Sequence, residues 1–268
     1  MNVKEIIDVI LAVNGGEKIE NTCDLLLEGS WDSRVTGVVT TFMATVDVIR
    51  RAPGLGCNLI ITHEPIYYTG RDRLEWIKDN PLYHKKKSLI DDNHLSVWRY
   101  HDHMHHGKTD LIYDGLLKDL GWSGYLDTGF PLPHCYTIPS TSLSGLVAFL
   151  KNKLDLKVVR VIGNVEMQCH RVGILVGGGS LGLGREEMPA QLMYDQQLDV
   201  IICGDIMEWT LSAYVRDAAA LGFHKAMIVV GHERSEYSGM KEMAKWLQPL
   251  VKDIPVQFCD SGEPFTYL

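Results

Sequence analysis

The sequence lacks a long apolar run, and this bears first on where the protein resides. No apolar run approaches the roughly 18–20 residues that a membrane-spanning helix needs. The segment 1–13 mixes Lys, Glu and Asp into its apolar positions, so it does not fit a signal peptide. We therefore expect a soluble, cytoplasmic protein without a membrane partner.

The sequence also lacks paired cysteines. Its six cysteines are scattered, with no CxxC motif and no close pair. Such spacing argues against a disulfide framework and fits a reducing compartment. We expect Cys57 and Cys203, which adjoin apolar runs, to be buried as small hydrophobic residues.

Basic residues are in deficit, since the formal net charge is −8. A nucleic-acid-binding surface needs Lys and Arg gathered on one face, so the composition argues against a nucleic-acid partner. The one basic run, Lys85-Lys86-Lys87, predicts a solvated helix face.

What the sequence does contain is an alternation of short Val- and Ile-rich runs with segments of helical periodicity. Strands are predicted at 35–41, 58–62, 95–100, 158–162, 172–176, 200–203 and 226–230. Helices are predicted at 44–51, 82–92, 142–154, 186–197, 209–221 and 236–250. This pattern is typical of an α/β fold with mostly parallel sheets, whose strands are apolar because helices cover both faces.

The stretch Gly124–Ser142 is rich in Gly, Pro and Ser and predicts a junction in the chain. Within it, Pro139 precedes three candidate helix caps at 140–142. We therefore expect two α/β halves, residues 1–125 and residues 126–268. A single continuous domain is the alternative.

Three polar segments each follow a predicted strand, at the place where open α/β sheets form ligand sites. The first is His63-Glu64-Pro65. Successive side chains at a strand end point apart, so His63 and Glu64 are suited to two neighbouring metals. The alternative is a turn that carries one exposed polar pair.

The second segment, His101-Asp102-His103-Met104-His105-His106, holds four of the eleven histidines. Four imidazoles so close together are hard to satisfy in a core, because each ring nitrogen needs a partner. Clustered imidazoles with carboxylates nearby suit zinc, manganese, iron, cobalt or nickel. The segment therefore predicts metal ligands.

The third segment, His232-Glu233-Arg234-Ser235-Glu236, follows a strand and Gly231. His232 and Glu236 are four residues apart and share one face of a helix that begins here, so both could reach one metal. The alternative is a helix start with acidic residues in its first turn.

A glycine-rich turn, Gly177-Gly178-Gly179-Ser180-Leu181-Gly182-Leu183-Gly184, lacks the Lys-Ser/Thr of a P-loop. Such a turn can offer backbone N–H groups to an anion. The alternative, which we favour, is a tight turn that packs close to another backbone.

With these residues, the chain resembles the Nif-three-like family of dinuclear-metal-centre proteins, often labelled GTP cyclohydrolase type 2 homologues. The similarity runs from about residue 3 to residue 260. In the family a strand, Gly-His, two residues and Ser-Glu lead into a helix, and the His and Glu are metal ligands. That motif falls on Gly231-His232 and Ser235-Glu236.

Two family motifs appear in altered form. The family's His-His-Pro is His63-Glu64-Pro65 here, and its His-x-x-x-Asp, whose Asp commonly bridges the metals, is His101-x-x-x-His105. The changes run in opposite directions, so four imidazoles and two carboxylates are retained. We infer that Glu64 could replace the missing bridging carboxylate. Asp102 and His103 are the alternatives if the turn differs by one residue.

The resemblance implies two similar α/β halves with the metal site in the cleft between them. It also implies a toroidal homohexamer whose sites face the interior. The implied cofactors are two divalent metals per chain, with Zn, Mn and Fe foremost. The predicted metal ligands are His63, Glu64, His101, His105, His232 and Glu236.

The function predicted from these features is a metal-dependent hydrolase acting on a small-molecule substrate that is a phosphoester, a nucleotide or a cyclic amidine. His101 or His103, if not bound to metal, is the candidate general acid or base, because imidazole titrates near neutrality. The runner-up is a non-catalytic metal-binding scaffold, metallochaperone or regulatory protein. A nucleotide-binding module that uses the glycine-rich turn is a third reading.

Overall fold

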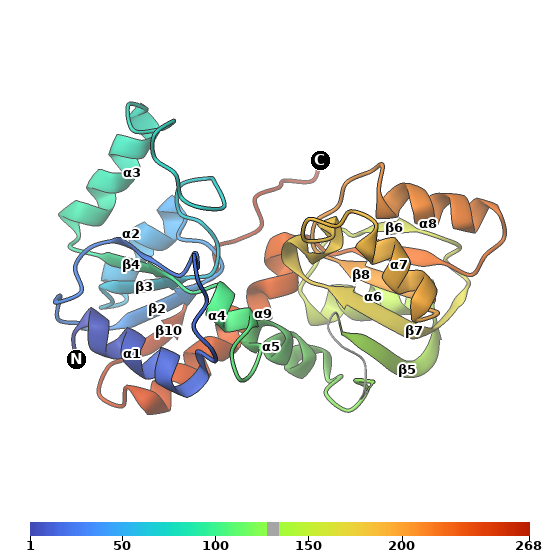
Figure 1. Cartoon of the computed structure of the whole chain (residues 1–268), viewed down its shortest axis with the longest axis horizontal. Helices are drawn as coiled ribbons and strands as arrows, with labels where there is room; N and C mark the ends of the chain where they lie inside the picture. The colour runs from blue at the N-terminus through green and yellow to red at the C-terminus, as the bar shows by residue number, and fades with distance from the viewer. Residues whose placement is uncertain (128–133) are drawn as a thin grey trace. The chain divides into compact units, whose positions relative to one another are not determined.

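The computed structural model describes residues 1–127 and 134–268 (Figure 1). The chain forms two compact units. The first contains Met1–Gly115 and Gly239–Gly262, and the second contains Leu116–Ser238 and Glu263–Leu268. Each unit has its own five-stranded sheet and its own buried apolar core.

The sheet of the first unit has the strand order β1-β4-β3-β2-β10. Strands β2, β3, β4 and β10 are parallel, and β1 pairs antiparallel with β4. The three central strands are buried along their whole length, as cover on both faces requires. The strands are β1 (Leu26–Glu28), β2 (Val38–Thr41), β3 (Leu59–Thr62), β4 (Ser96–Arg99) and β10 (Val256–Phe258).

Side-chain caps start the helices of the first unit. Asn2 and Glu5 form a capping box at α1, Thr45 accepts from the backbone of Val48 at α2, and Asn80 caps α3. In Figure 1, α1 lies on one side of this sheet and α2 on the other. The helices are α1 (Val3–Asn14), α2 (Val46–Gly54), α3 (Pro81–Asp92) and the single turn α4 (Asp102–His105).

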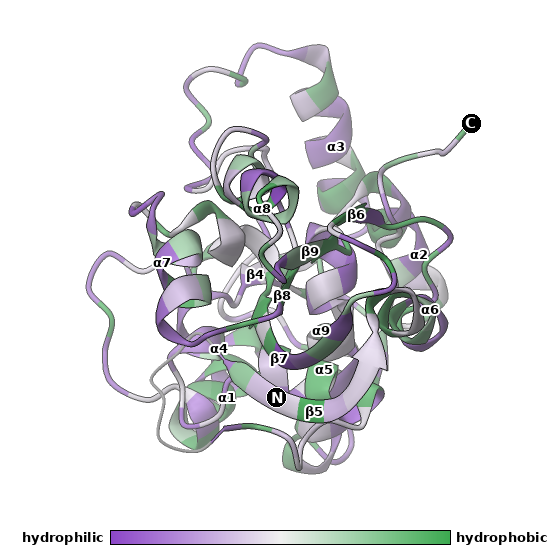
Figure 2. Ribbon diagram, turned by 90° about the vertical axis from the view of Figure 1, so that its right-hand side faces the viewer, coloured by the Kyte–Doolittle hydropathy of each residue, from purple (hydrophilic) through white to green (hydrophobic). Residues whose placement is uncertain are grey.

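The sheet of the second unit has the order β5-β7-β8-β9-β6 and is mixed. Its centre, β7-β8-β9, is parallel, while β5 and β6 pair antiparallel at the edges. In Figure 2 the strands β8 and β9 carry the hydrophobic colour. The strands are β5 (Cys135–Ser142), β6 (Arg160–Ile162), β7 (Gln168–Leu175), β8 (Val200–Cys203) and β9 (Ala226–Val229).

The second unit's helices follow its strands, as the periodicity predicts. Ser142 caps α6 by accepting from the backbone of Gly145. The helices are α6 (Leu143–Lys153), α7 (Met188–Asp195), α8 (Leu211–Ala220) and 3₁₀ turns at Gly177–Leu181 and Gln248–Leu250, the last in the first unit. The chain changes unit within α5 (Leu111–Leu120) and again within α9 (His232–Leu247).

The predicted α/β class is confirmed, with two mixed five-stranded sheets. Every predicted strand and helix is present, with shifts at the ends. Strand β10 completes the first sheet from near the C-terminus, although the expected halves would leave it in the second. The predicted junction falls partly on residues 128–133, outside the described residues, and its last part is β5.

Within 1–127 and 134–268, no helix combines the length and hydropathy of a membrane span. All six cysteines are buried, and none forms a disulfide in the described part of the chain. Cys57 packs in the core of the first unit and Cys203 in that of the second, as predicted.

The basic run on α3 is only in part the solvated face that its charge predicts, because Lys85 is exposed whereas Lys86 is buried. Lys86 is 2% exposed and donates from Nζ to the carbonyl oxygen of Ile66 at 2.6 Å. Its Nζ also lies 5.1 Å from the ring centre of Tyr68. Lys87 pairs with Glu28 at 2.9 Å. The alkyl stem of a lysine can be buried when its ammonium finds acceptors, and a short charge run does not reveal those acceptors.

Lys86→Met tests the effect of this buried amine on stability. Burial lowers the pKa of Lys86 from 10.5 to about 8, so the unfolded chain binds more protons than the folded chain between those values. The contribution of Lys86 to the free energy of unfolding should therefore rise with pH across this window, by on the order of 3 kcal/mol. Urea denaturation of both proteins at about pH 7.5 and about pH 10 measures the difference. An identical pH dependence would contradict the assignment.

Candidate metal centre

In the first unit, two predicted ligand segments follow neighbouring parallel strands. Thr62, the last residue of β3, is in register with Arg99, the last residue of β4. The chain continues to His63 after the first strand and to His101, one residue further on, after the second. Because the carboxyl ends of parallel strands meet at one edge of a sheet, the two histidines come together there.

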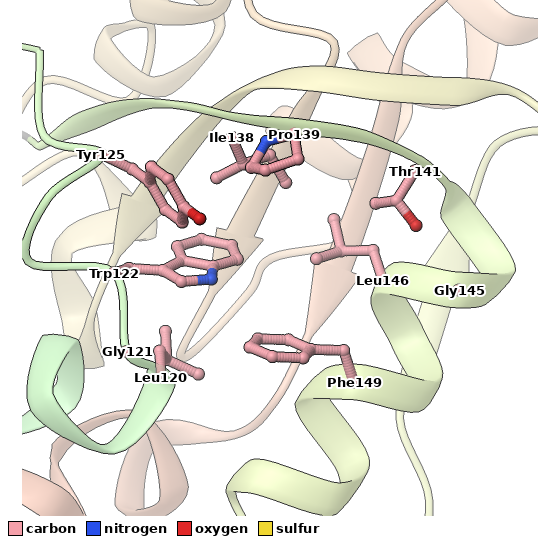
Figure 3. Close-up of a pocket in the computed structure, with 10 residues that line it drawn as sticks. All are labelled: Leu120, Gly121, Trp122, Tyr125, Ile138, Pro139, Thr141, Gly145, Leu146 and Phe149. Atoms are coloured by element: carbon pink, nitrogen blue, oxygen red, sulfur yellow. The ribbon is translucent and has the colours of Figure 1, made fainter.

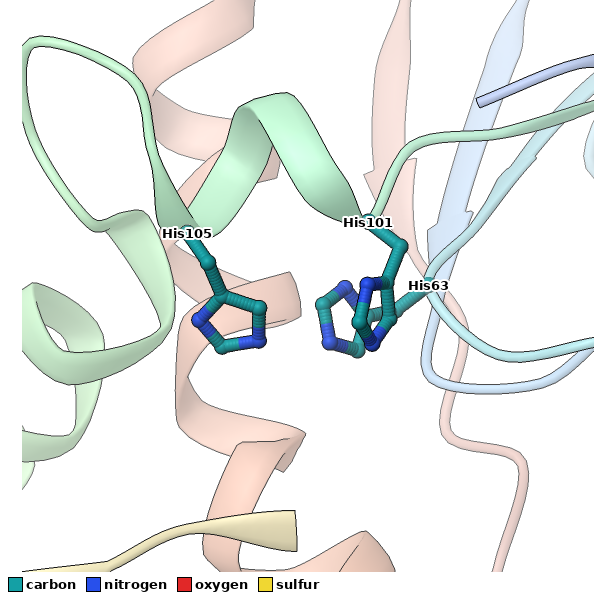
Figure 4. Close-up of side chains that lie close together, drawn as sticks. All are labelled: His63, His101 and His105. Atoms are coloured by element: carbon teal, nitrogen blue, oxygen red, sulfur yellow. The ribbon is translucent and has the colours of Figure 1, made fainter. Parts of the chain in front are cut away.

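His105 joins them from the other end of α4 (Figure 4). The ring centres of His63 and His101 are 4.5 Å apart, and that of His105 is 5.0 Å from His63 and 5.1 Å from His101. One ring nitrogen from each lies within 4.8 Å of the others. Three imidazoles at this spacing are a donor set that could hold a divalent metal ion.

Each of these rings is anchored through Nδ1. The acceptors are the carbonyl oxygen of Tyr100 for His63 at 3.2 Å, Asp102 for His101 at 3.1 Å, and Asp110 for His105 at 3.0 Å. These oxygens can only accept, so Nδ1 carries the hydrogen in each neutral ring and Nε2 carries the lone pair. Metal-binding histidines are held in this way in proteins, which fixes both tautomer and ring direction.

The pKa values of His63 and His101 are shifted in opposite directions. Burial, with His101 and His105 nearby, holds the pKa of His63 well below its usual range, so this ring is neutral and ready to ligate. Burial also disfavours the charged form of His101. Hydrogen bonds with Asp102, Cys23 and Glu64 outweigh that effect and raise its pKa to about 12. A metal bound by His101 therefore has to displace a proton.

Glu64 lies beside the cluster in this unit. Its carboxylate oxygens are 3.5 Å from His101 Nε2 and 3.7 Å from the guanidinium of Arg99. Arg99 is buried and also donates from Nε to the carbonyl oxygen of His63 at 3.2 Å. Arg99 thus contacts both members of the His63-Glu64 pair and holds the turn that presents them.

The turn at 101–103 is held by Asp24, which the sequence did not single out. Its carboxylate accepts the backbone N–H groups of His101, Asp102 and His103 at 2.6, 2.8 and 2.9 Å. It also accepts from the ring Nδ1 of His103 at 2.7 Å. His103 is therefore held by Asp24, and among the described residues it belongs to no candidate metal group.

In the second unit the same strand-end arrangement recurs. Strands β7, β8 and β9 are parallel neighbours, with Leu175 in register with Cys203 and Cys203 with Val229. Gly177, Asp205 and His232 follow those three ends. The edge of this sheet therefore collects a glycine, a carboxylate and an imidazole.

His232 and Glu236 form a pair on the first turns of α9, as the spacing predicts. His232 Nε2 lies 3.1 Å from a carboxylate oxygen of Glu236, and its Nδ1 lies 2.8 Å from Asp205. Ser235 fixes the helix start by donating to the carbonyl oxygen of His232 at 2.7 Å. Its hydroxyl oxygen accepts the N–H of Gly177 at 2.9 Å.

The glycine-rich turn packs against this pair. A Cβ at Gly177 would lie 2.0 Å from Glu236 Oε1 and 2.7 Å from His232 Nε2, and the backbone φ there is +49°. A Cβ at Gly204 would meet the backbone of Gly177 at 2.5 Å. The favoured interpretation of the turn, close packing against other groups, agrees with these contacts.

The second unit also has an apolar pocket of about 270 Å³. The rings of Trp122 and Phe149 lie parallel there, with centres 5.8 Å apart, and Tyr125 stands beside them (Figure 3). None of the predicted metal ligands lines this pocket. It is a feature separate from the two histidine groups.

Comparison with known proteins gives the family. The profile of Duf34/NIF3 (NGG1p interacting factor 3) matches residues 1–264. The chain belongs to the Duf34/NIF3 family. The expected resemblance is thereby confirmed over nearly the whole length of this NIF3 protein.

Individual relatives of this NIF3 protein agree. A Clostridium perfringens protein named GTP cyclohydrolase 1 type 2 homolog is 24% identical over 278 residues, spanning 100% of this chain and 98% of the relative. A Bacillus cereus structure described as related to NIF3 superposes with a TM-score of 0.76 at 15% identity, covering 100% and 99% of the two chains. Staphylococcus aureus protein SA1388 gives 0.73 at 21% identity with the same coverage. These two structures support the fold alone.

Within each unit, predicted ligands of this NIF3 protein lie close to one another. His63, His101 and His105 come together, with Glu64 beside them, and His232 pairs with Glu236. That all six serve one dinuclear centre stays a prediction. Sequence reasoning missed Asp24, Asp110 and Asp205 as anchors. Of these three anchors, only Asp110 left a local signal in the sequence, because it lies a few positions after the histidine that it holds.

Gly177→Ala should disrupt the His232–Glu236 pair. The added methyl group overlaps the Glu236 carboxylate and requires a strained left-handed backbone, so both side chains have to move. We expect metal affinity to fall at least about tenfold, as measured by competition with a chromogenic chelator. Gly178→Ala is the matched control, because a Cβ there has nothing within 4 Å. Equal affinities for the two variants would contradict this account of the turn.

Asp110→Asn tests the anchoring of His105. The amide removes the charge that orients Nδ1–H, and losses of this kind typically weaken metal binding about 10–100-fold. Calorimetric titration with Zn²⁺ measures the change. Asp8→Asn, which removes an exposed carboxylate paired with Lys4, is the control and should bind as the parent protein does.

Proposed function

We propose that this NIF3 protein is a dinuclear metal-dependent hydrolase. The proposed ligands are His63, Glu64, His101, His105, His232 and Glu236, and the ions are two divalent metals of the Zn, Mn or Fe type. One observation carries the proposal. In all four ligand histidines Nδ1 is anchored by a carbonyl or carboxylate oxygen, so that Nε2 is the donor.

The donor chemistry supports this assignment. Neutral imidazole and carboxylate together suit borderline divalent ions. The buried, neutral ring of His63 has the state that ligation requires. Glu64 offers a carboxylate next to the cluster at the position where the resemblance places an imidazole. It is our candidate for the bridging role that the family gives to an Asp.

Two bound divalent ions would supply a hydroxide nucleophile near neutral pH and neutralise charge on the leaving oxygen. The protein's own residues do the remaining work. Arg99 holds the Glu64 side chain and the His63 carbonyl, and Asp24 holds the turn that presents His101. With His101 engaged in the cluster, His103 is the remaining candidate for proton transfer. Asp24 fixes its Nδ1–H, which leaves Nε2 as the proton acceptor.

The substrate class follows from this chemistry. Phosphoesters, nucleotides and cyclic amidines all react by attack of an activated water. The name of the Clostridium perfringens relative brings cyclohydrolase activity into this set at 24% identity. A homohexamer with inward-facing sites is also part of the proposal. Light scattering on the purified protein tests it.

A second function is a non-catalytic metal-binding scaffold, metallochaperone or regulatory protein. Burial favours it, because His63 is 0% exposed and Glu236 is 2% exposed. Closed sites usually have structural roles, whereas catalytic sites keep an open position for water or substrate. The side chains of His101 and His232, at 28% and 27% exposed, offer such an opening and favour the hydrolase.

Metal content and hydrolysis test the proposal together. The purified protein should hold about two divalent ions per chain and hydrolyse at least one compound in a phosphoester, nucleotide and cyclic-amidine screen, with activity lost on chelation and restored by metal. A metal content of the purified protein that is not near two equivalents per chain would contradict the central claim. Bound metal without turnover supports the scaffold function instead.

Variants test whether both histidine groups serve one centre. His63→Ala and His232→Ala should each weaken the binding of both metals and lower kcat at least about 100-fold, because each removes a ligand of a shared pair. His224→Ala, at an exposed histidine outside the proposed set, is the control. With Mn²⁺ bound, electron paramagnetic resonance should show an exchange-coupled pair. A spectrum of two isolated ions would show that the groups act separately.

A further inference from the structure

Cys23 differs from the other cysteines in its surroundings. Cys57, Cys135, Cys203 and Cys259 belong to the apolar core clusters. Cys23 lies in the loop before β1 and faces polar groups, with its thiol donating to Asp102 Oδ1 at 3.3 Å. A buried thiol that contacts a carboxylate and an imidazole is a set of metal donors, not a small core residue.

The three donors of this set converge within the first unit. Cys23 Sγ, a ring nitrogen of His101 and a carboxylate oxygen of Asp102 lie within 4.8 Å of one another. The Sγ–Oδ1 distance is 3.3 Å and the distance from His101 Nδ1 to Oδ1 is 3.1 Å. Tetrahedral zinc with ordinary bond lengths separates such donors by about 3.6 and about 3.4 Å. The two observed distances are therefore each within roughly 0.3 Å of the values for tetrahedral zinc.

The carboxylate of Asp102 is already oriented for this role. Its Oδ2 accepts from the hydroxyl of Thr22 at 3.0 Å and from the backbone N–H of Cys23 at 2.9 Å. Oδ1 is thereby turned toward the thiol and the imidazole. The side chains of His101 and Asp102 are 28% and 24% exposed, so an ion and a completing water can reach them.

We propose that Cys23, His101 and Asp102 form a thiolate-containing subsite for a thiophilic divalent ion such as Zn²⁺, which shares His101 with the cluster of His63, His101 and His105. Binding forms bonds from the ion to Sγ, Nδ1 and Oδ1. The Cys23 S–H bond breaks and its proton goes to the buffer. The imidazolium of His101 loses its Nδ1 proton to the buffer and keeps Nε2–H, which faces the Glu64 carboxylate at 3.5 Å.

His101 links this subsite to the other donors. A neutral imidazole has one lone pair, so the ring ligates either through Nε2 beside His63 and His105 or through Nδ1 beside Cys23. An ion in the thiolate subsite therefore withdraws His101 from the histidine group. The subsite itself does not depend on the proposed hydrolase, but its regulatory effect does.

Cobalt spectroscopy on the full chain tests the subsite. With excess Co²⁺, the parent protein should show a thiolate-to-cobalt charge-transfer band in the near ultraviolet. The band should disappear in Cys23→Ser and require at least about tenfold more Co²⁺ in Asp102→Asn. It should persist in Cys169→Ser, the matched control, and in His63→Ala and His232→Ala, which remove only the ligands of the proposed dinuclear centre. No band in the parent protein, or an undiminished band in Cys23→Ser, would overturn the proposal.

X-ray absorption of the zinc-loaded parent protein gives a second readout that needs no variant. A sulfur neighbour at about 2.3 Å from zinc is expected. A zinc shell of nitrogen and oxygen alone, at saturating Zn²⁺, would reject the subsite whatever the fate of the variants. Loss of hydrolysis with an intact sulfur signal would reject the proposed function and leave the subsite standing.

Discussion

The candidate centre depends on one repeated contact, an oxygen acceptor on the Nδ1 of each ligand histidine. A neutral imidazole has a single lone pair, so a carboxylate or carbonyl at Nδ1 decides that Nε2 is the donor. His63 uses the carbonyl of Tyr100, while His101, His105 and His232 use Asp102, Asp110 and Asp205. Without these acceptors the rings could rotate and exchange tautomers. The close spacing of the histidines would then not define which ring nitrogens face a metal ion.

The two units reach this contact by the same route. Parallel strands end together at one edge of each sheet, and the next residues carry the polar groups. In the second unit the close packing of these polar groups also requires glycine at position 177, because a Cβ there has no room beside Glu236. The glycine at position 177 is therefore a packing requirement of the His232–Glu236 pair.

The sequence predicts what is local and periodic. Apolar runs indicated the strands, and residues following those runs indicated His63, His101 and His232. Contacts between segments far apart in the chain left no local signal. Asp24 holds a turn 77 residues away, and Asp205 anchors a histidine 27 residues away. Lys86 was expected at the surface because charge patterns do not reveal the acceptor provided by Ile66. The pairing of β10 with β2 likewise requires the C-terminal part of the chain to return to the first sheet. Hydrophobic periodicity does not predict such a return.

The departures from the family motifs, Glu64 and His105, are explained within the first unit by their neighbours. Glu64 contacts Arg99 and His101, and His105 has its own anchor in Asp110. The most direct test of the account is anomalous diffraction from crystals loaded with stoichiometric metal, recorded at the metal's absorption edge. The account predicts two peaks, with Nε2 of His63, His105 and His232 at about 2.0–2.1 Å for zinc. Ligation of those histidines through Nδ1, or no peak beside them, would contradict it.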